Sequence, residues 1–453
     1  MSTEDRTSWA LLALLAVAQF MVVLDITIVN VALPSIGAGL GFAPADLQWV
    51  VTAYVLCSGG LLLVGGRAAD MVGRRRTFLA GLGVFTAASL ACGLAPSPGF
   101  LIAARAVQGS GAALLTPSAL AIVTSTYTGA QRVTALSLWG AIASGGIGVG
   151  VLLGGILTSA LSWHWVFLVN VPVGLAAALL VPRVVPALPG RGRRSLDLPG
   201  GLTAVAGLGV LVYALSGAPD HGWGSARTLL LLAVAAALLA SFALLERVAK
   251  EPLVAPSTWR IGSLVSGSVM MLGATGIMAG AFFLNSLHLQ DALGFSALET
   301  GLAFLPFVAA ILAGVHVSSR AIGRAGSRVP IVAGMLFVTA GALLFAVAHD
   351  SYGELLPGFL VLGLGVGLAF PAISITAMSD VPHESSGTGS GVMSTFHEVG
   401  AALGVAALSA IAFGSDYQAA AIGAAIAGAA LTLLAAAFVP AVRPAPGAHA
   451  MMH

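Results

Sequence analysis

Residues 9–33, WALLALLAVAQFMVVLDITIVNVAL, decide the fold and contain a single charged side chain, Asp25. As an α-helix rising about 1.5 Å per residue, this stretch exceeds the roughly 30 Å thickness of a bilayer's hydrocarbon core. Backbone groups in that core must pair within the protein, which leaves helices and closed barrels as possible structures. A barrel strand is about ten residues of alternating polarity, whereas this stretch is apolar almost throughout. It predicts a membrane-spanning helix.

Runs of this kind make up most of the chain. Hydrophobic residues occupy 58% of 453 positions and charged residues 8%, with a mean hydropathy of +1.00. A water-soluble domain carries charge on about a quarter of its residues, so lipid has to cover most of this surface. We therefore predict an all-α polytopic membrane protein. Its fourteen predicted spans are 9–33, 48–66, 77–95, 99–122, 134–160, 164–185, 198–217, 227–247, 262–287, 300–318, 329–348, 354–377, 390–413 and 418–441.

The basic residues orient these spans, because Lys and Arg stay on the cytoplasmic side of a membrane. A cytoplasmic N-terminus places on that side all 19 basic residues except Arg227, which falls outside, and Arg105, which lies within a span. Thirteen or fifteen spans would destroy this sorting, so we expect fourteen, with both termini cytoplasmic. The first apolar run lacks a small-residue cleavage site and is predicted to be a retained helix. We expect a multi-pass protein of a bacterial inner (plasma) membrane.

An internal repeat divides the chain. The loop after the second span contains Gly-Arg-Arg-Arg at 73–76, and the loop after the tenth contains Arg-Ala-Gly-Ser-Arg at 324–328. If these loops correspond, spans 1–6 and 9–14 are two parallel six-helix halves, and spans 7 and 8 are an inserted pair. Two such halves rocking about a central site form the alternating-access arrangement of transporters. The predicted regions are an N-terminal half over 1–185, a linker with the inserted helices over 186–260, a C-terminal half over 261–441 and a cytoplasmic tail over 442–453.

Three strong charges lie at membrane depth: Asp25, Arg105 and Glu398. Burial of a charge there costs at least a few kcal/mol, so each is a candidate for function. Asp25 lies about 24 Å along its helix from the cytoplasmic end, and Arg105 about 8 Å in from the opposite face. Both therefore reach the outer half of the bilayer, where we expect them to pair. The pair is either a proton-coupling site or a structural link between two helices.

Glu398 lies about 12 Å from the cytoplasmic end of its predicted span. Burial without a fixed cation favours the protonated form of a carboxyl group, so Glu398 is a candidate for binding and releasing a proton. The adjacent His397 is a second titratable group that could take part. The alternative is a glutamate that faces a water-filled vestibule and has no coupling role.

Further polar and aromatic side chains in the spans are candidates for substrate contacts: Asn30, Gln108, Phe282, His288 and Gln290. For His288 and Gln290 we favour a role at helix interfaces. Cys57 and Cys92 both lie in apolar runs and are predicted to be packing residues. No spacing of His, Cys, Asp and Glu indicates a metal site.

The fifth predicted span is rich in glycine. Gly146, Gly150 and Gly154 recur at four-residue spacing, with Gly155 beside them. Small residues at this spacing let helix backbones approach closely. The pattern predicts tight helix packing or a sliding surface between the two halves, and these interpretations are compatible.

Four stretches of the first half stand out together: 24–34 (LDITIVNVALP), 66–76 (GRAADMVGRRR), 105–111 (RAVQGSG) and 163–174 (WHWVFLVNVPVG). In this order they resemble the first-helix signature, the helix 2–3 loop motif, the helix 4 motif and the opening of helix 6 in one branch of the major facilitator superfamily. That branch is the fourteen-spanner drug/proton antiporters. The second half is similar to it mainly in its pattern of spans.

The resemblance implies the superfamily's fold, with two six-helix halves and two inserted helices. It also implies that Arg105 takes part in proton transfer, and that one loop gates the conformational change. The gating candidates are Gly66, Asp70, Gly73, Arg74 and Arg75, to which we add the four glycines of the fifth span. Two departures matter: 150–155 (GVLLGG) lacks the proline of the helix 5 antiporter motif, and the pair His397-Glu398 stands where the branch usually has Arg-Gln. Details of coupling are therefore expected to differ.

The expected function is secondary active transport, and not an enzyme reaction. We expect proton-coupled efflux of small apolar or cationic compounds, such as antibiotics or secondary metabolites. The expected partners are the lipid bilayer, a small-molecule substrate and protons; we expect no cofactor besides the proton gradient, no nucleic acid, and a monomer. The alternative is uptake or facilitated passage of a polar metabolite such as a sugar or an organic anion, for which the spans hold few Asn, Gln or Lys. No phosphate-binding loop or nucleophile–base arrangement indicates an embedded enzyme, and no repeated pore segment indicates a channel.

Overall fold

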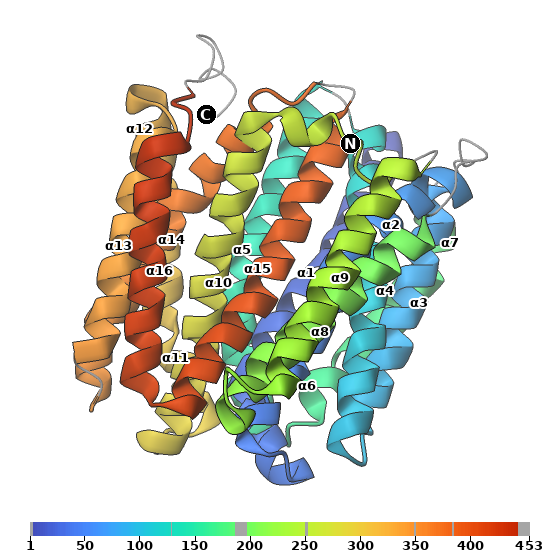
Figure 1. Ribbon diagram of the computed structural model, residues 1–453. Helices are drawn as coiled ribbons and strands as arrows, with labels where there is room; N and C mark the ends of the chain where they lie inside the picture. Colours follow the sequence, from blue (N-terminus) through green and yellow to red (C-terminus); the bar gives the residue numbers. More distant parts are fainter. Residues whose placement is uncertain are drawn as a thin grey trace. The chain divides into compact units, whose positions relative to one another are not determined.

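The computed structural model describes residues 3–127, 129–185, 197–249, 252–347, 350–382 and 385–442, and the regular elements within these ranges are all helical (Figure 1). Thirteen helices are long and apolar enough to cross a membrane, and Gly145–Ala160, the second half of α5, form a shorter apolar segment. Each of the fourteen predicted spans falls on a helix, which confirms the all-α membrane fold. Predicted linker residues 186–196 and tail residues 443–453 lie outside the described residues.

The chain forms two compact units, and the first comprises Met1–Gly209, Ala237–Leu253 and Phe295–Leu302. Its helices are α1 (Thr3–Leu40), α2 (Trp49–Val72), α3 (Arg74–Gly93), α4 (Pro98–Thr126), α5 (Gly129–Ala160), α6 (Trp165–Leu168) and α7 (Asn170–Val184), with the short 3-10 turn η1 (Pro44–Asp46) before α2. It also includes the first part of α8 (Leu198–His221), the last part of α9 (Ala226–Val248) and most of α11 (Ala297–Ala303).

The second unit comprises Val210–Ala236, Val254–Gly294 and Ala303–His453. Its helices are α10 (Gly262–Leu287), α12 (Leu305–Ala325), α13 (Arg328–Val347), α14 (Tyr352–Met378), α15 (Ser386–Gly414) and α16 (Tyr417–Phe438). The 3-10 turn η2 (Thr258–Arg260) precedes α10, and the π-helical η3 (His288–Ala292) extends it. Because α8 and α9 contribute to both units, the exact bounds of the predicted halves and insert remain a prediction.

The same helix pairings occur in both units. In the first, α4 packs against α2 and α3, α1 against α5, and α7 against α3 and α1. In the second, α14 packs against α12 and α13, α10 against α15, and α16 against α13 and α10; Figure 1 shows α13 beside α16. This recurrence is what two parallel six-helix halves require.

Two glycines of α4 allow three helices to meet closely. A Cβ atom on Gly111 would lie 2.6 Å from the backbone nitrogen of Phe85 in α3, and one on Gly109 would overlap the carbonyl group of Tyr54 in α2. Only glycine lets the backbones touch in this way. The contact draws Tyr54 and Phe85 into the core around α4.

Several predicted spans differ in detail from the observed helices. α1 extends beyond both ends of 9–33 and continues past Pro34, because neighbouring groups satisfy freed backbone atoms inside a membrane protein. The span 164–185 is divided between α6 and α7, and the span 300–318 between α11 and α12. The second division falls at Phe304, just before Pro306, because the first turn of a helix is where a proline is best accommodated.

Candidate functional site

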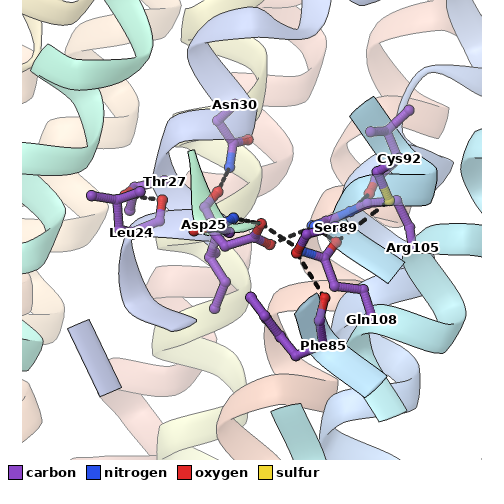
Figure 2. Close-up of polar contacts among 12 residues, drawn as sticks. Leu24, Asp25, Thr27, Asn30, Phe85, Ser89, Cys92, Arg105 and Gln108 are labelled. Carbon is purple, nitrogen blue, oxygen red and sulfur yellow. Dashed lines mark hydrogen bonds and ion pairs between the residues drawn. The ribbon is translucent and has the colours of Figure 1, made fainter. Parts of the chain in front are cut away.

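Asp25 of α1 and Arg105 of α4 form an ion pair in the first unit. Arg105 Nη1 lies 2.5 Å from Asp25 Oδ2, and neither side chain is exposed beyond 1%. The pairing predicted from helix depth is therefore present (Figure 2). A buried charge that lost its partner would be strongly destabilising, so the two residues hold each other in the core.

Both carboxylate oxygens of Asp25 are hydrogen-bonded. Oδ2 accepts from Arg105, while Oδ1 accepts from Gln108 Nε2 over 2.7 Å and from Asn170 Nδ2 over 3.0 Å. Arg105 and Gln108 are three residues apart on α4, a spacing that puts both on one face of the helix. Asn170 comes from a different element, the first residue of α7. The ionised form of Asp25 thus has three donors from two elements.

The guanidinium of Arg105 is also fully accommodated. Its Nε donates to Val50 O over 2.8 Å and its Nη1 to Gln108 Oε1 over 2.7 Å. The ring of Tyr54 lies 4.2 Å from Cζ, and the ring of Phe167 lies 5.7 Å from it. Aromatic faces attract cations, more strongly where water is excluded. Residues of α2, α4 and α6 therefore replace the hydration shell of this cation.

Gln108 connects the ion pair to α3. Its Nε2 donates to Ser89 Oγ over 2.8 Å, and Ser89 Oγ in turn donates to Phe85 O over 2.7 Å. Cys92 Sγ donates to Gln108 Oε1 over 3.6 Å (Figure 2). Gln108 is completely buried and uses both amide atoms within this network, so in this structure it contacts protein groups where the sequence suggested a substrate contact.

Sequence reasoning missed three members of the network. The sequence patterns single out neither Asn170 nor Ser89, and they predict only a packing role for Cys92. The available signal was their type: polar side chains within apolar spans need hydrogen-bond partners. Asn170 also lies within the 163–174 stretch that resembles the family, although resemblance alone gives it no contact with Asp25.

Glu398 and His397 lie on α15 in the second unit. His397 Nδ1 is 3.0 Å from Thr275 Oγ1 of α10, and the ring of Phe370 meets the imidazole edge-on at 5.9 Å. Glu398 is half-buried, and no hydrogen bond or ion pair reaches its carboxylate from the residues that the structure describes. Gly400 packs against Leu272 of α10, and Glu398, two positions earlier, points about 200° away around the helix. It therefore faces away from α10.

The remaining substrate candidates have contacts within their own units. Asn30 Nδ2 donates to Ile26 O over 2.8 Å. The Phe282 ring lies 4.3 Å from that of Phe304 and lines a small apolar cavity with other phenylalanines of α12, α13 and α14. The His288 ring stacks on Tyr417 at 4.3 Å, and Gln290 Nε2 donates to Ser286 O over 3.4 Å.

The gating candidates surround the turn between α2 and α3. Gly73 adopts a φ of +104°, a region that side chains rarely enter. Arg75 Nη1 donates to Val185 O, the residue after α7, over 3.2 Å, while Asp70 is exposed and Arg74 half-buried. A Cβ on Gly66 would lie 3.8 Å from Pro117 of α4. This turn is therefore tied to the end of α7.

The glycine face of α5 packs against α1. A Cβ on Gly146 would lie 2.8 Å from Val23, and one on Gly154 would lie 2.8 Å from Ile28 O. Gly155 faces a different neighbour, because its Cβ would lie 2.8 Å from Ala297 O in α11. Tight packing, one of the two predicted roles, is thus present within the first unit.

No group of three or more His, Cys, Asp or Glu side chains that could hold a metal ion occurs among the described residues.

The fold and the site together define a class of protein: a polytopic helical membrane protein with an ion pair buried among its membrane-spanning helices. A family model described as Major Facilitator Superfamily matches residues 15–405 and, in a second match, 278–451. The chain belongs to the Major Facilitator Superfamily and is a multi-pass membrane transporter.

Several relatives carry names that describe export or resistance. The chain is 41% identical over 423 residues to the puromycin resistance protein pur8 of Streptomyces alboniger, covering 91% of this chain and 83% of the relative. It is 41% identical over 418 residues to the cephamycin export protein CmcT of Amycolatopsis lactamdurans, covering 90% and 85%. It is 34% identical over 426 residues to the lincomycin resistance protein of Streptomyces lincolnensis, covering 91% and 86%.

A solved structure shows the same fold. The human organic anion transporter MFSD10 (TETRAN) superimposes with a TM-score of 0.65, covering 96% of this chain and 100% of that one. Its sequence identity is 15%, so the likeness concerns the fold alone.

Proposed function

We propose that this transporter exports small apolar or cationic compounds, antibiotics among them, from the bacterial cytoplasm in exchange for protons. It would work as a monomer in the inner (plasma) membrane, with both termini cytoplasmic. Relatives named for puromycin resistance, cephamycin export and lincomycin resistance support the direction and the class of cargo. They favour this function over uptake of a polar metabolite.

The observation that carries the proposal is the presence of two carboxylates within membrane spans, in contrasting surroundings. Asp25 is ion-paired and accepts three hydrogen bonds, whereas Glu398 is half-buried with no partner from the described residues. Keeping a carboxyl group charged at this depth costs free energy, so the presence of two such groups indicates that each has a function. In this proposal each acid binds and releases a proton during the transport cycle.

The other candidate residues keep the roles proposed from the sequence. Asn30 and Phe282 are proposed to contribute to substrate contacts, and His397 to modulate its neighbour Glu398. For His288 and Gln290, a role at helix interfaces stays favoured over a substrate contact. The turn around Gly73, with Gly66, Asp70, Arg74 and Arg75, is proposed to gate the conformational change. The hydrogen bond from Arg75 to Val185 O gives this turn a contact that could break and re-form.

The test uses an efflux-deficient bacterium that expresses the chain and is challenged with puromycin, lincomycin and a cephamycin. We expect resistance to at least one compound, lost on addition of a protonophore and lost in Asp25→Asn and Glu398→Gln. Asp46→Asn is the matched control, because Asp46 is an exposed acid in η1 and its loss should leave resistance intact. Resistance that survives the protonophore and both variants would rule out proton coupling through these acids.

A further inference from the structure

One short segment of the first unit touches both members of the ion pair. It consists of Trp163 and His164, the helix α6 and the first residue of α7, Asn170. Phe167 of α6 lies against the guanidinium of Arg105, and Asn170 donates to Asp25 Oδ1. Movement of this segment would therefore change the contacts of both Asp25 and Arg105.

The segment is packed between α1 and α3. The rings of Trp163 and His164 stack at 3.7 Å, and a Cβ on Gly39 of α1 would lie 2.5 Å from Trp163 Nε1. On the other side, a Cβ on Gly93 of α3 would lie 2.6 Å from Leu168. Asp25 is 0% exposed, so a proton reaches it only when some of the surrounding packing opens.

Asn170 differs from the other two donors to Asp25. Arg105 and Gln108 both project from α4 and move with that helix, whereas Asn170 starts α7, directly after the break that separates it from α6. A hydrogen bond to an ionised carboxylate favours the ionised form. A proton that binds Oδ1 forms an O–H bond at an atom that already accepts two N–H groups, so one of those donors has to withdraw.

We propose that Asn170 is a positioning residue for Asp25, which keeps the carboxylate ionised while the α6–α7 segment is seated and lets it take a proton when the segment moves. The proton comes from the aqueous phase, the hydrogen bond from Asn170 Nδ2 is broken, and Arg105 keeps its charge throughout. The proposal rests on the proposed function in one respect, namely that Asp25 exchanges the transported proton.

Few other groups that carry or gain charge face Asp25. Arg105 comes from α4, Cys92 of α3 donates to the same Gln108 amide that binds Asp25, and Tyr54 of α2 lies against the guanidinium. The α5 residues 145–160, which include the glycines packed against α1, hold no titratable side chain, and α6 contributes none either. Replacing Asn170 with an apolar residue therefore removes a donor without adding or removing charge near Asp25.

The test measures protonation of Asp25 directly in the full chain, purified and reconstituted into lipid vesicles. Infrared spectra across a pH series would follow the carboxylic acid band in a Glu398→Gln background, with Asp25→Asn identifying the band that belongs to Asp25. In Asn170→Leu, which is similar in size and lacks the donor, we expect the Asp25 carboxylic acid band to persist to higher pH than in the parent protein, because a donor to the ionised form is lost. An unchanged midpoint in a folded Asn170→Leu protein overturns the proposal.

Asn285→Leu is the matched control. Asn285 is also 2% exposed, donates to Ala281 O and accepts from Tyr417 OH, but it lies in the second unit. Asn285→Leu should destabilise the fold without changing the pH at which Asp25 is half protonated. A shift equal to that of Asn170→Leu would show that general destabilisation causes the effect, and would overturn the proposal. If Asn170→Leu does not fold, Asn170→Ser, which keeps a shorter donor, should give a smaller shift in the same direction, and no shift would overturn the proposal.

The proposed function can be disproved independently of the role proposed for Asn170. If Asp25→Asn still exports drug with normal dependence on the proton gradient, Asp25 is not a coupling acid. The infrared titration still reports whether Asn170 controls its protonation.

Discussion

Gly150 of α5 lies directly against Thr27 of α1, with no room between them for a methyl group. Thr27 is two residues beyond Asp25 and its hydroxyl donates to Leu24 O over 3.1 Å. The glycine face of α5 therefore supports the part of α1 that carries the buried carboxylate. Packing between these two helices and the geometry of the ion pair are linked through this contact.

A first prediction concerns this contact. Gly150→Ala should lower the free energy of unfolding by about 1–3 kcal/mol, because the added methyl group forces α1 and α5 apart. Gly145→Ala on the same helix is the control, since a Cβ there meets nothing within 4 Å and alanine has the higher helix propensity. Thermal unfolding in detergent compares the two, and equal melting temperatures would contradict the packing described for Gly150.

A second prediction concerns the ion pair. Arg105→Met should lower stability by about 3–5 kcal/mol, because it leaves the Asp25 carboxylate buried without its cation. The double variant Asp25→Leu/Arg105→Met should recover much of this loss, since no charge is left unpaired, yet it should not transport. Denaturation of the purified variants gives the stabilities and vesicle assays give the transport. A double variant no more stable than Arg105→Met alone would show that an unpaired Asp25 is not the source of the loss.

Glu398 provides a third prediction, which separates coupling from stability. Since no described residue bonds its carboxylate, Glu398→Gln should change the free energy of unfolding by less than about 0.5 kcal/mol. Proton-driven transport should nevertheless fall at least tenfold, a difference equal to about 1.4 kcal/mol in a barrier. Thermal melts and uptake into inverted vesicles measure the two effects, and a variant that is stable and fully coupled would exclude Glu398 from the mechanism.

A fourth prediction concerns the turn between α2 and α3. Gly73→Ala should destabilise the protein by about 1–2 kcal/mol, because a side chain is strained at a φ of +104°. Gly99→Ala is the control, as Gly99 has an ordinary φ and open space around its Cβ position. Differential scanning calorimetry distinguishes them, and identical transitions would show that the turn relaxes without strain.

Much of the fold was predictable from the sequence because the bilayer imposes strict rules. Apolar length alone located every span, including the one over α5. The breaks within spans are less accessible than the spans themselves. Both breaks precede a proline in the first turn of the next helix, Pro306 in α12 and Pro172 in α7. Hydropathy does not register this signal, because each break lies inside a continuous apolar run.

The charged residues of the site could be predicted from the sequence, but the neutral side chains that hydrogen-bond to them could not. Helix depth was sufficient to pair Asp25 with Arg105, because two opposite charges at one level in hydrocarbon have strong reason to meet. Asn170 lies 145 positions from Asp25 in the chain, and its amide could have bonded to many backbone groups instead. Which face of α7 meets α1 is decided by packing of whole helices, so the third donor appears only in the structure.

The central claim is that transport is coupled to protons through Asp25 and Glu398, and its most direct test is to measure proton movement driven by substrate. Purified protein is reconstituted into vesicles with equal pH on both sides and a pH-sensitive dye inside, and an outward gradient of puromycin or another exported antibiotic is then imposed. We predict a pH change in the vesicle lumen that is absent in Asp25→Asn and in Glu398→Gln. Substrate movement with no change in luminal pH, at equal rates in all three proteins, would contradict proton coupling through these carboxylates.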